Sequence, residues 1–287
     1  MNWADLQLLL AFADAGTLKA AAETQGVNIS TVSRRLRTLE GEIGAKVVEN
    51  VGGRLTLTES GERAVAAARA MRHASDDLLR DVAGKDDELA GPVRIGLLEM
   101  FVRYHASAFV ELSRSYPNLE LKFLTSGRLQ SLTQREIDVA IRVTQTPEET
   151  LVGRSVYAME FQVFASPELT RSTKDYRKLP WVIWHEAARA TLAEQWVAEN
   201  LPTGCICGRV VSAVSMMDLV QAGVGAAILP RKHALLAGLE PLSPVLEEFT
   251  TPVWVLTHRD LASSARVRAV TDHLYRVLRD FGREDGA

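Results

Sequence analysis

The chain has 287 residues, of which 47% are hydrophobic and 24% are charged. That length and composition predict a folded globular protein of about two domains and exclude a disordered or fibrous chain. The 33 lysines and arginines against 36 aspartates and glutamates leave a net charge of −3, so only a local pattern could indicate a nucleic-acid partner. The two cysteines, Cys205 and Cys207, are too few and too close together for a disulfide framework, which favours a reducing cytoplasm. We find no export signal and no run of eighteen apolar residues, so we expect neither secretion nor a membrane span.

Three short helices are predicted near the start of the chain. Apolar residues recur at helical spacing over 6–13, an alanine-rich segment covers 18–25, and a third apolar stripe runs from Asn28 to Gly44. A glycine follows each segment, as it does at the C-terminal end of many helices. The second and third helices, joined by a tight turn at Gly26, are typical of a helix-turn-helix motif whose later helix reads DNA.

The polar residues of the third helix indicate which side chains would meet DNA. Hydroxyl groups near its N-terminal end with arginines behind them suit a helix inserted in the major groove. The candidate DNA-binding residues are Asn28, Ile29, Ser30, Thr31, Ser33, Arg34, Arg35 and Arg37, together with Arg54. An arginine cluster is also common on a merely solvated helix face, and Ile29 suits either a thymine methyl group or burial against the preceding helix.

A hairpin is predicted after the third helix. The stretch 46–57 contains two short strand patterns around Gly52-Gly53, which would form the wing of a winged helix-turn-helix over 1–58. The six basic and six acidic side chains of this region cancel. We therefore expect one copy to bind DNA weakly and two copies to read an interrupted inverted repeat.

A long helix is predicted over 59–83. Its repeat of small side chains, Ala64, Ala68 and Ser75 among them, favours pairing with a second copy of the chain. The alternative is that this helix packs on its own chain. We assign 59–90 to the linker, because Gly91-Pro92 marks a domain boundary.

Beyond the linker, strand and helix patterns alternate, which favours a mainly parallel sheet with helices on both faces. The expected strands are 93–97, 119–124, 139–143, 161–165, 181–184, 208–214 and 226–229, and the expected helices are 101–116, 129–135, 191–200 and 216–222. Two such α/β units indicate a hinged pair with a cleft between them.

Segments along nearly the whole chain resemble the LysR-type transcriptional regulators. The matching segments are 18–22, 27–36, 39–40, 43–44, 57–61, 116–121, 138–143, 222–230 and 264–268. The resemblance implies an α/β protein with an N-terminal winged helix-turn-helix, a dimerising linker helix and a C-terminal two-lobed domain like type 2 periplasmic binding proteins. That domain would cover 91–287, with lobe I over about 91–161 and 266–287 and lobe II over about 162–265.

The resemblance also implies a regulator that is not an enzyme and that needs no cofactor or metal. Its partners would be double-stranded DNA, a small-molecule effector, further copies of the chain in a dimer or tetramer, and RNA polymerase. The alternative class is a solute-binding or enzyme-like α/β protein without regulatory DNA binding. That class leaves the helix with hydroxyls and arginines without a role.

Two short segments depart from the family pattern. Val47-Val48-Glu49-Asn50 lacks the usual wing arginine, a contact that Arg54 would have to supply. The common Gln-Pro of the recognition helix is Ile29-Ser30 here.

The carboxyl ends of the predicted strands should line an effector site, because open α/β sheets bind ligands there. The candidate residues are Leu98, Glu99, Met100, Thr125, Ser126 and Ser212. Glu99 departs from the family, whose matching positions commonly suit an anion. A carboxylate there would repel an acidic effector unless it is protonated or paired, for example with Arg128 or Arg142, and so favours a neutral or cationic ligand. The alternative is that Glu99 points into solvent and the hydroxyl residues govern the site.

Three other motifs carry no function. Gly223-Val224-Gly225 follows a predicted helix and enters a strand, the reverse of the order that a dinucleotide site needs. His185-Glu186 lacks the second histidine of a zinc protease motif. Cys205 and Cys207 without a nearby histidine are more often structural than metal-binding.

Overall fold

The computed structural model describes residues 2–82, 89–125, 137–185, 191–202 and 204–283. The described residues fall into two compact units, 2–82 and 89–283, each with its own core. The predicted helix over 129–135 lies outside the described residues.

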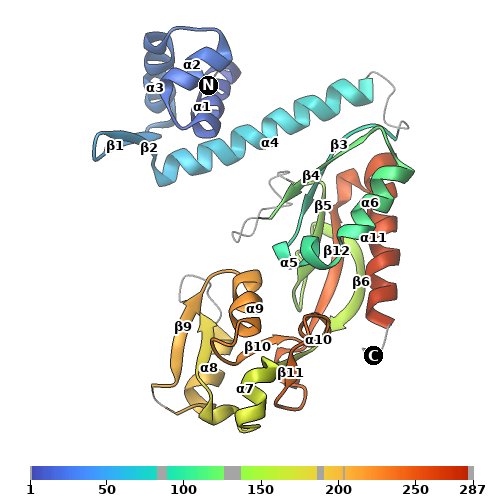
Figure 1. Ribbon diagram of the computed structural model, residues 1–287. Coiled ribbons are helices and arrows are strands. Elements are labelled where there is room, and N and C mark those ends of the chain that lie inside the picture. Colours follow the sequence, from blue (N-terminus) through green and yellow to red (C-terminus); the bar gives the residue numbers. More distant parts are fainter. Residues whose placement is uncertain (1, 83–88, 126–136, 186–190, 203, 284–287) are drawn as a thin grey trace. The chain divides into compact units, whose positions relative to one another are not determined.

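The first unit is a three-helix motif with a hairpin and a long helix (Figure 1). Its elements are α1 (Trp3–Ala15), α2 (Leu18–Gln25), α3 (Ile29–Ile43), β1 (Val48–Val51), β2 (Arg54–Leu57) and α4 (Glu59–Val82). The strands pair antiparallel, and Gly52 and Gly53 take φ values of 59° and 84°, as a two-residue hairpin turn requires. The predicted helices, hairpin and glycine helix ends of this unit are confirmed.

The start of α4 packs on its own chain. Val65 and Ala68 are buried in one core with Leu9 of α1 and Leu36 of α3, and Ala68 is 0% exposed. Arg69 reinforces this contact through an ion pair with Asp14 of α1. The prediction that Ala68 lies in a seam between two copies is therefore wrong, because α1 already covers it.

A close approach fixes where α4 begins. Its residue Gly61 lies over the backbone of Val47, and a Cβ at Gly61 would stand 2.0 Å from the Val47 carbonyl oxygen. The Thr58 hydroxyl donates to the Lys46 carbonyl at 2.5 Å and accepts from the Gly61 amide at 3.0 Å. Thr58 thus caps α4, as predicted, and joins the hairpin to it.

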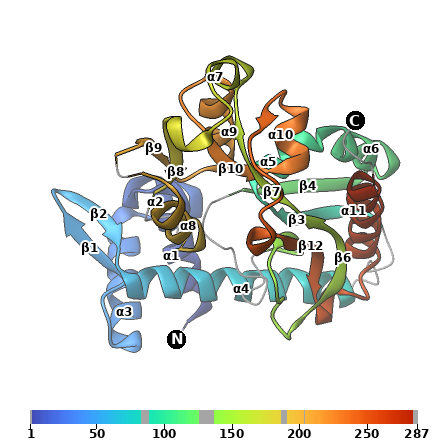
Figure 2. The ribbon, with the colours of Figure 1, turned by 90° about the horizontal axis from the view of Figure 1, so that it is seen from below.

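The second unit begins with a five-stranded sheet in the order β4-β3-β5-β12-β6. Its elements are β3 (Gly91–Gly96), α5 (Glu99–Tyr104), α6 (Ala106–Ser115), β4 (Leu119–Leu124), β5 (Val139–Val143), β6 (Leu151–Met159), β12 (Thr251–His258), a 3-10 turn (Arg259–Leu261) and α11 (Ala265–Arg283). We call this part lobe I. Its core joins Ile95, Phe101 and Leu112 to Val270 and Leu274 of α11, which lies along β6 and β12 (Figures 1 and 2).

The remaining elements form lobe II around two small sheets. They are β7 (Phe161–Ala165), α7 (Pro167–Ser172), a 3-10 turn (Tyr176–Lys178), β8 (Trp181–Trp184), α8 (Thr191–Asn200), β9 (Ile206–Val210), α9 (Ala213–Gln221), β10 (Ala227–Pro230), α10 (Arg231–Leu236), β11 (Glu240–Pro241) and a 3-10 turn (Glu247–Phe249). A bridge between Trp181 and Ala226 connects the sheets β10-β7-β11 and β8-β9. Val163, Trp181 and Met217 are fully or almost fully buried among these elements.

Three expectations for the second unit are wrong. The sheet of lobe I is mixed, because β12 runs antiparallel to both β5 and β6. Strand β12 belongs to that sheet, so the chain is again part of lobe I from Thr251 onward. The predicted end of lobe II near residue 265 is therefore too late. The single helix expected over 101–116 is two helices, because the backbone leaves helical geometry at His105 (φ −121°, ψ 24°).

Candidate nucleic-acid interface and effector site

Helix α3 buries one face and leaves the other open. Val32, Leu36 and Leu39 are buried in the core of the first unit at spacings of four and three. Its predicted DNA-binding residues fall outside this stripe: Ile29, Ser30, Arg34 and Arg37 are exposed, and Thr31 and Ser33 are half-buried. Asn28 is the N-cap residue, but its side chain makes no capping hydrogen bond, so helix formation does not occupy its amide.

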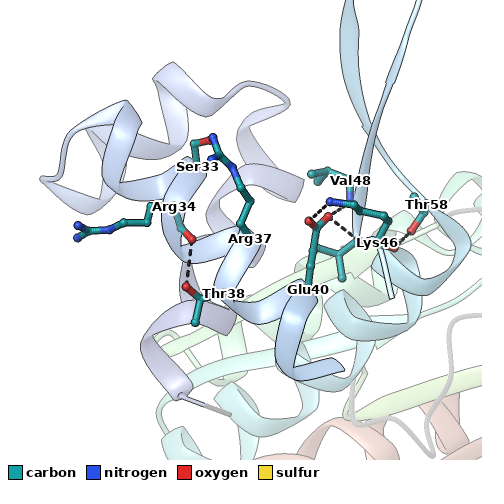
Figure 3. A network of polar contacts seen from close by, with 9 residues as sticks. Ser33, Arg34, Arg37, Thr38, Glu40, Lys46, Val48 and Thr58 are labelled. Atoms are coloured by element: carbon teal, nitrogen blue, oxygen red, sulfur yellow. Dashed lines mark hydrogen bonds and ion pairs between the residues drawn. The ribbon is translucent and has the colours of Figure 1, made fainter. Parts of the chain in front are cut away.

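Arg34 and Arg37 supply the positive charge of the exposed face. The Arg37 guanidinium donates to the Ser33 hydroxyl at 3.1 Å, one turn back on the same helix. Within the described residues the Arg34 guanidinium has no partner, and Figure 3 shows it extending away from the other labelled side chains. Thr38 donates to the Arg34 carbonyl at 3.2 Å and continues this polar strip.

Arg35 has a different role from its neighbours. Its guanidinium donates to the Asp5 carboxylate of α1 at 3.2 Å, and Asp5 is almost fully buried. A rotation of about 100° per residue carries Arg35 to the side of α3 that faces α1. Arg35 therefore holds two helices together, and its predicted DNA contact stays a prediction.

Glu40 is a central residue that the sequence analysis missed. Its carboxylate is 7% exposed and accepts from the Lys46 ammonium at 2.7 Å and from the Val47 and Val48 amides at 3.1 and 3.4 Å (Figure 3). Burial alone would raise the pKa of Glu40, but these hydrogen bonds outweigh it and lower the pKa below its usual value. Glu40 thereby fixes the start of the hairpin against α3. Glu40 lies four residues after Leu36, on the buried stripe of α3, and that spacing was the signal in the sequence.

Arg54 lies at the turn of the hairpin. One of its guanidinium nitrogens is 3.9 Å from the point where a Cβ on Gly16 would stand, so the side chain reaches back to the turn between α1 and α2. Arg54 is exposed and remains the cation that the hairpin offers in place of the absent wing arginine.

The predicted effector residues of lobe I divide between core and surface. Strands β3 and β4 are parallel, and Gly96 stands beside Leu124, so the residues after both strands leave the sheet at one edge. Leu98 and Glu99 are exposed there and Thr125 is half-buried, whereas Met100 is 2% exposed in the core of lobe I. The prediction that Met100 lines the site is therefore wrong. Ser126 and Arg128 lie outside the described residues.

Ser212 meets Glu99 across the two lobes. It is the N-cap of α9, where its hydroxyl oxygen accepts from the Ser215 amide at 3.4 Å. The same hydroxyl donates to Glu99 Oε2 at 3.2 Å. One turn further along α5, Arg103 forms an ion pair of 2.5 Å with Asp218 of α9, which the sequence did not suggest. Helices α5 and α9 thus carry polar side chains that join the lobes.

A buried pair of histidines lies at a second contact of the lobes. His105 and His233 have ring centroids 6.0 Å apart, and His233 also packs on Tyr104 and Phe281. Burial lowers the pKa of His105 to about 4, and burial together with the charges of His105 and Lys232 lowers that of His233 to about 3. Both rings are therefore neutral at pH 7. Lys232 donates to the carbonyls of Phe281 and Gly282, where a cation complements the helix terminus.

Other motifs examined in the sequence carry no site. The Cys207 thiol donates to the Trp181 carbonyl at 3.2 Å, and burial raises the pKa of the Cys205 thiol. Among the described residues no group of three or more histidine, cysteine, aspartate or glutamate side chains could hold a metal ion. In the same part of the chain no helix is long and apolar enough to cross a membrane.

The comparison with protein families covers both units. Residues 3–62 match the bacterial regulatory helix-turn-helix protein, lysR family, and residues 86–279 match the LysR substrate binding domain. The chain therefore belongs to the LysR family of transcriptional regulators, as its resemblance indicated.

Individual relatives agree with this assignment. The chain is 31% identical over 144 residues to the HTH-type transcriptional regulator PtxR of Pseudomonas aeruginosa, covering 50% of this chain and 46% of that protein. It is 30% identical over 165 residues to the HTH-type transcriptional activator TtdR of Escherichia coli K12, covering 57% and 53%. The chain thus spans about half the length of these curated relatives.

Solved structures share the fold over almost the whole chain. CbnR, a LysR family transcriptional regulator, has a TM-score of 0.65 at 15% identity and covers 97% of this chain and 99% of its own. Full-length LysG from Corynebacterium glutamicum, solved with bound effector Arg, has a TM-score of 0.59 at 21% identity and covers 96% and 99%. At these identities the likeness establishes the fold alone.

Proposed function

We propose that this chain is a sequence-specific DNA-binding regulator of transcription whose helix α3 reads the major groove. The observation that carries the proposal is the exposed strip of α3, where Arg34 and Arg37 project from a helix held by its buried face and by Arg35 and Glu40. Arginines near hydroxyls on such a helix suit guanine edges and phosphates. CbnR, which shares this fold, has been solved in complex with its target DNA.

The proposed DNA contacts are Asn28, Ile29, Ser30, Thr31, Ser33, Arg34 and Arg37 of α3, with Arg54 of the hairpin. Ile29 is 46% exposed, which favours contact with a thymine methyl group over burial against α2. Because the basic and acidic side chains of 1–58 cancel, we propose that two or four copies bind an interrupted inverted repeat. RNA polymerase would be the further partner of such a regulator, and the cytoplasm its place of action.

We propose that a small molecule binds near Leu98, Glu99 and Thr125 of lobe I and Ser212 of lobe II, and that it alters DNA binding without being chemically changed. This edge is where strands β3 and β4 end, the position at which open α/β sheets bind ligands. LysG, solved with an arginine effector, supports a ligand site in this fold.

The DNA proposal is tested by measuring the affinity of the full chain for a mapped duplex at several salt concentrations. Arg34→Ala should weaken binding by about tenfold, and the slope of log affinity against log salt should flatten by about one if Arg34 neutralises a phosphate. Arg114→Ala on α6 is the matched control, because it removes an equal charge from the other unit. Wild-type affinity and slope in both Arg34→Ala and Arg37→Ala would reject α3 as the reading helix.

A further inference from the structure

We propose that the effector of this chain carries a positively charged ammonium or guanidinium group that binds the Glu99 carboxylate. The inference deepens the proposed function and rests on its ligand site at the edge of β3 and β4. It is carried by the polar contacts that helices α5 and α9 make with each other.

Glu99 has a neutral partner. Its side chain is exposed at the first residue of α5, and among the described residues its contact is the Ser212 hydroxyl at 3.2 Å. A hydroxyl hydrogen bond orients the carboxylate but leaves its negative charge unbalanced. The contact orients the carboxylate toward lobe II, although Glu99 remains exposed.

Several cations on the described elements around Glu99 already have other partners. Arg103, at the next turn of α5, forms its ion pair with Asp218 of α9. On the strands of lobe I, Arg94 pairs with Asp138 at 3.4 Å and Lys122 with Glu120 at 3.3 Å, and Glu148 attracts Arg142. In lobe II, the Arg209 guanidinium donates to the Trp184 carbonyl at 3.5 Å. Among the charged side chains of α5 and α9 themselves, the carboxylates Glu99 and Asp218 share one guanidinium, that of Arg103, so these two helices carry one excess negative charge.

This excess charge determines which ligand fits. The amino end of α9 would by itself favour an anion, but Glu99 already lies against its N-cap residue Ser212. A ligand carboxylate would therefore meet a carboxylate at the position it would have to occupy. A ligand cation instead gains a charge-assisted hydrogen bond with Glu99, which is about twice as strong as a neutral one, and neutralises the excess charge.

Isothermal titration calorimetry of the full chain tests the proposal with a panel of arginine, lysine, ornithine, agmatine and putrescine. Citrulline serves as the neutral isostere of arginine and succinate as an anion. We expect at least one cation to bind and citrulline and succinate to bind at least tenfold more weakly. Glu99→Gln should weaken the cation at least tenfold, because it keeps the side-chain volume but removes the charge. Glu111→Gln on α6 is the control, since that carboxylate pairs with Arg276 elsewhere in lobe I.

A second variant removes the Ser212 hydroxyl that donates to the Glu99 carboxylate. Ser212→Ala should strengthen binding of the cation, because the hydroxyl competes for the same carboxylate oxygen. Failure of every cation to bind, preferential binding of succinate, or unchanged cation binding in Glu99→Gln would each overturn the proposal. DNA affinity measured on the same samples keeps the two proposals apart, because intact DNA binding without cation binding rejects the ligand class alone.

Discussion

At the scale of single residues, the first unit depends on side chains whose partners lie outside their own element. Arg35 and Arg34 are adjacent in sequence, yet one pairs with Asp5 of α1 and the other extends from the surface. Glu40 is a charged side chain in a buried position where apolar residues are usual. The hydrogen bonds from the Val47 and Val48 amides offset the cost of burying its carboxylate. The periodicity of α3 could predict its buried stripe, but these pairings depend on where α1 and the hairpin pack against it.

Glu40→Gln should destabilise the junction of α3 and the hairpin by about 2 kcal/mol at pH 7, because it removes a charged acceptor from an ammonium and two amides. The folded state lowers the pKa of Glu40, so its contribution is complete above the unfolded value near 4.5 and is lost as the pH falls through the folded value. Hydrogen exchange of peptides from 29–57 measures the local stability. An equal difference between wild type and variant at pH 7 and pH 3 would contradict the assignment.

Burial of His233 should make the unfolding free energy of the second unit depend on pH. Its pKa is lowered to about 3 in the folded chain, whereas an unfolded histidine titrates near 6.5, so protons bind the unfolded state first. Stability should therefore fall as the pH drops from about 6.5 toward 4, by about 2 kcal/mol at pH 5 for each buried histidine. Urea unfolding followed by tryptophan fluorescence reports on this unit, which holds four of the five tryptophans.

His233→Phe should remove part of that pH dependence. Both ring nitrogens of His233 are buried without a partner among the described residues, so an aromatic ring without nitrogens should leave stability at pH 7 unchanged or raise it. A variant whose unfolding free energy still falls as steeply as that of wild type between pH 6.5 and pH 5 would show that His233 does not titrate as inferred.

At the scale of elements, most helices and strands could be predicted from local patterns, and the errors arose where distant segments pack. The stripe on α4 was real, but its first half faces α1 and not a second copy. Strand β12 could not be assigned to lobe I from its own residues, because its place is set by pairing with β5 and β6, more than ninety residues earlier. The break occurs at His105, whose ring contacts His233 of lobe II, and the helical periodicity of 101–116 does not contain that contact.

Ala68→Asp tests the packing of α4 within one chain. An unpaired carboxylate in a position that is 0% exposed should destabilise the first unit by about 3 kcal/mol or more and abolish DNA binding. Ala67→Asp is the matched control, because Ala67 is exposed on the same helix. Circular dichroism on heating compares the two variants. If Ala68→Asp unfolds at the same temperature as Ala67→Asp but no longer self-associates, Ala68 lies at an interface between two copies, and its packing within one chain is contradicted.

At the scale of the whole molecule, one chain combines a unit suited to DNA with a unit suited to a small ligand. The family, the two units and the buried and exposed sides of α3 could be predicted from motifs spread along the sequence. The interlobe contacts between Glu99 and Ser212 and between Arg103 and Asp218 could not, because each joins residues more than a hundred positions apart. Those contacts are where a ligand could change the relation between the lobes and so affect DNA binding.

The most direct test of the account is a genome-wide map of DNA bound by the full chain in its native host, compared with the Arg34→Ala, Arg37→Ala double variant at equal protein level. The wild type should give discrete peaks centred on interrupted inverted repeats, and the double variant should lose them. Peaks that persist unchanged in the double variant, or a wild-type chain that yields no discrete peaks, would contradict the assignment of α3 as the element that reads DNA.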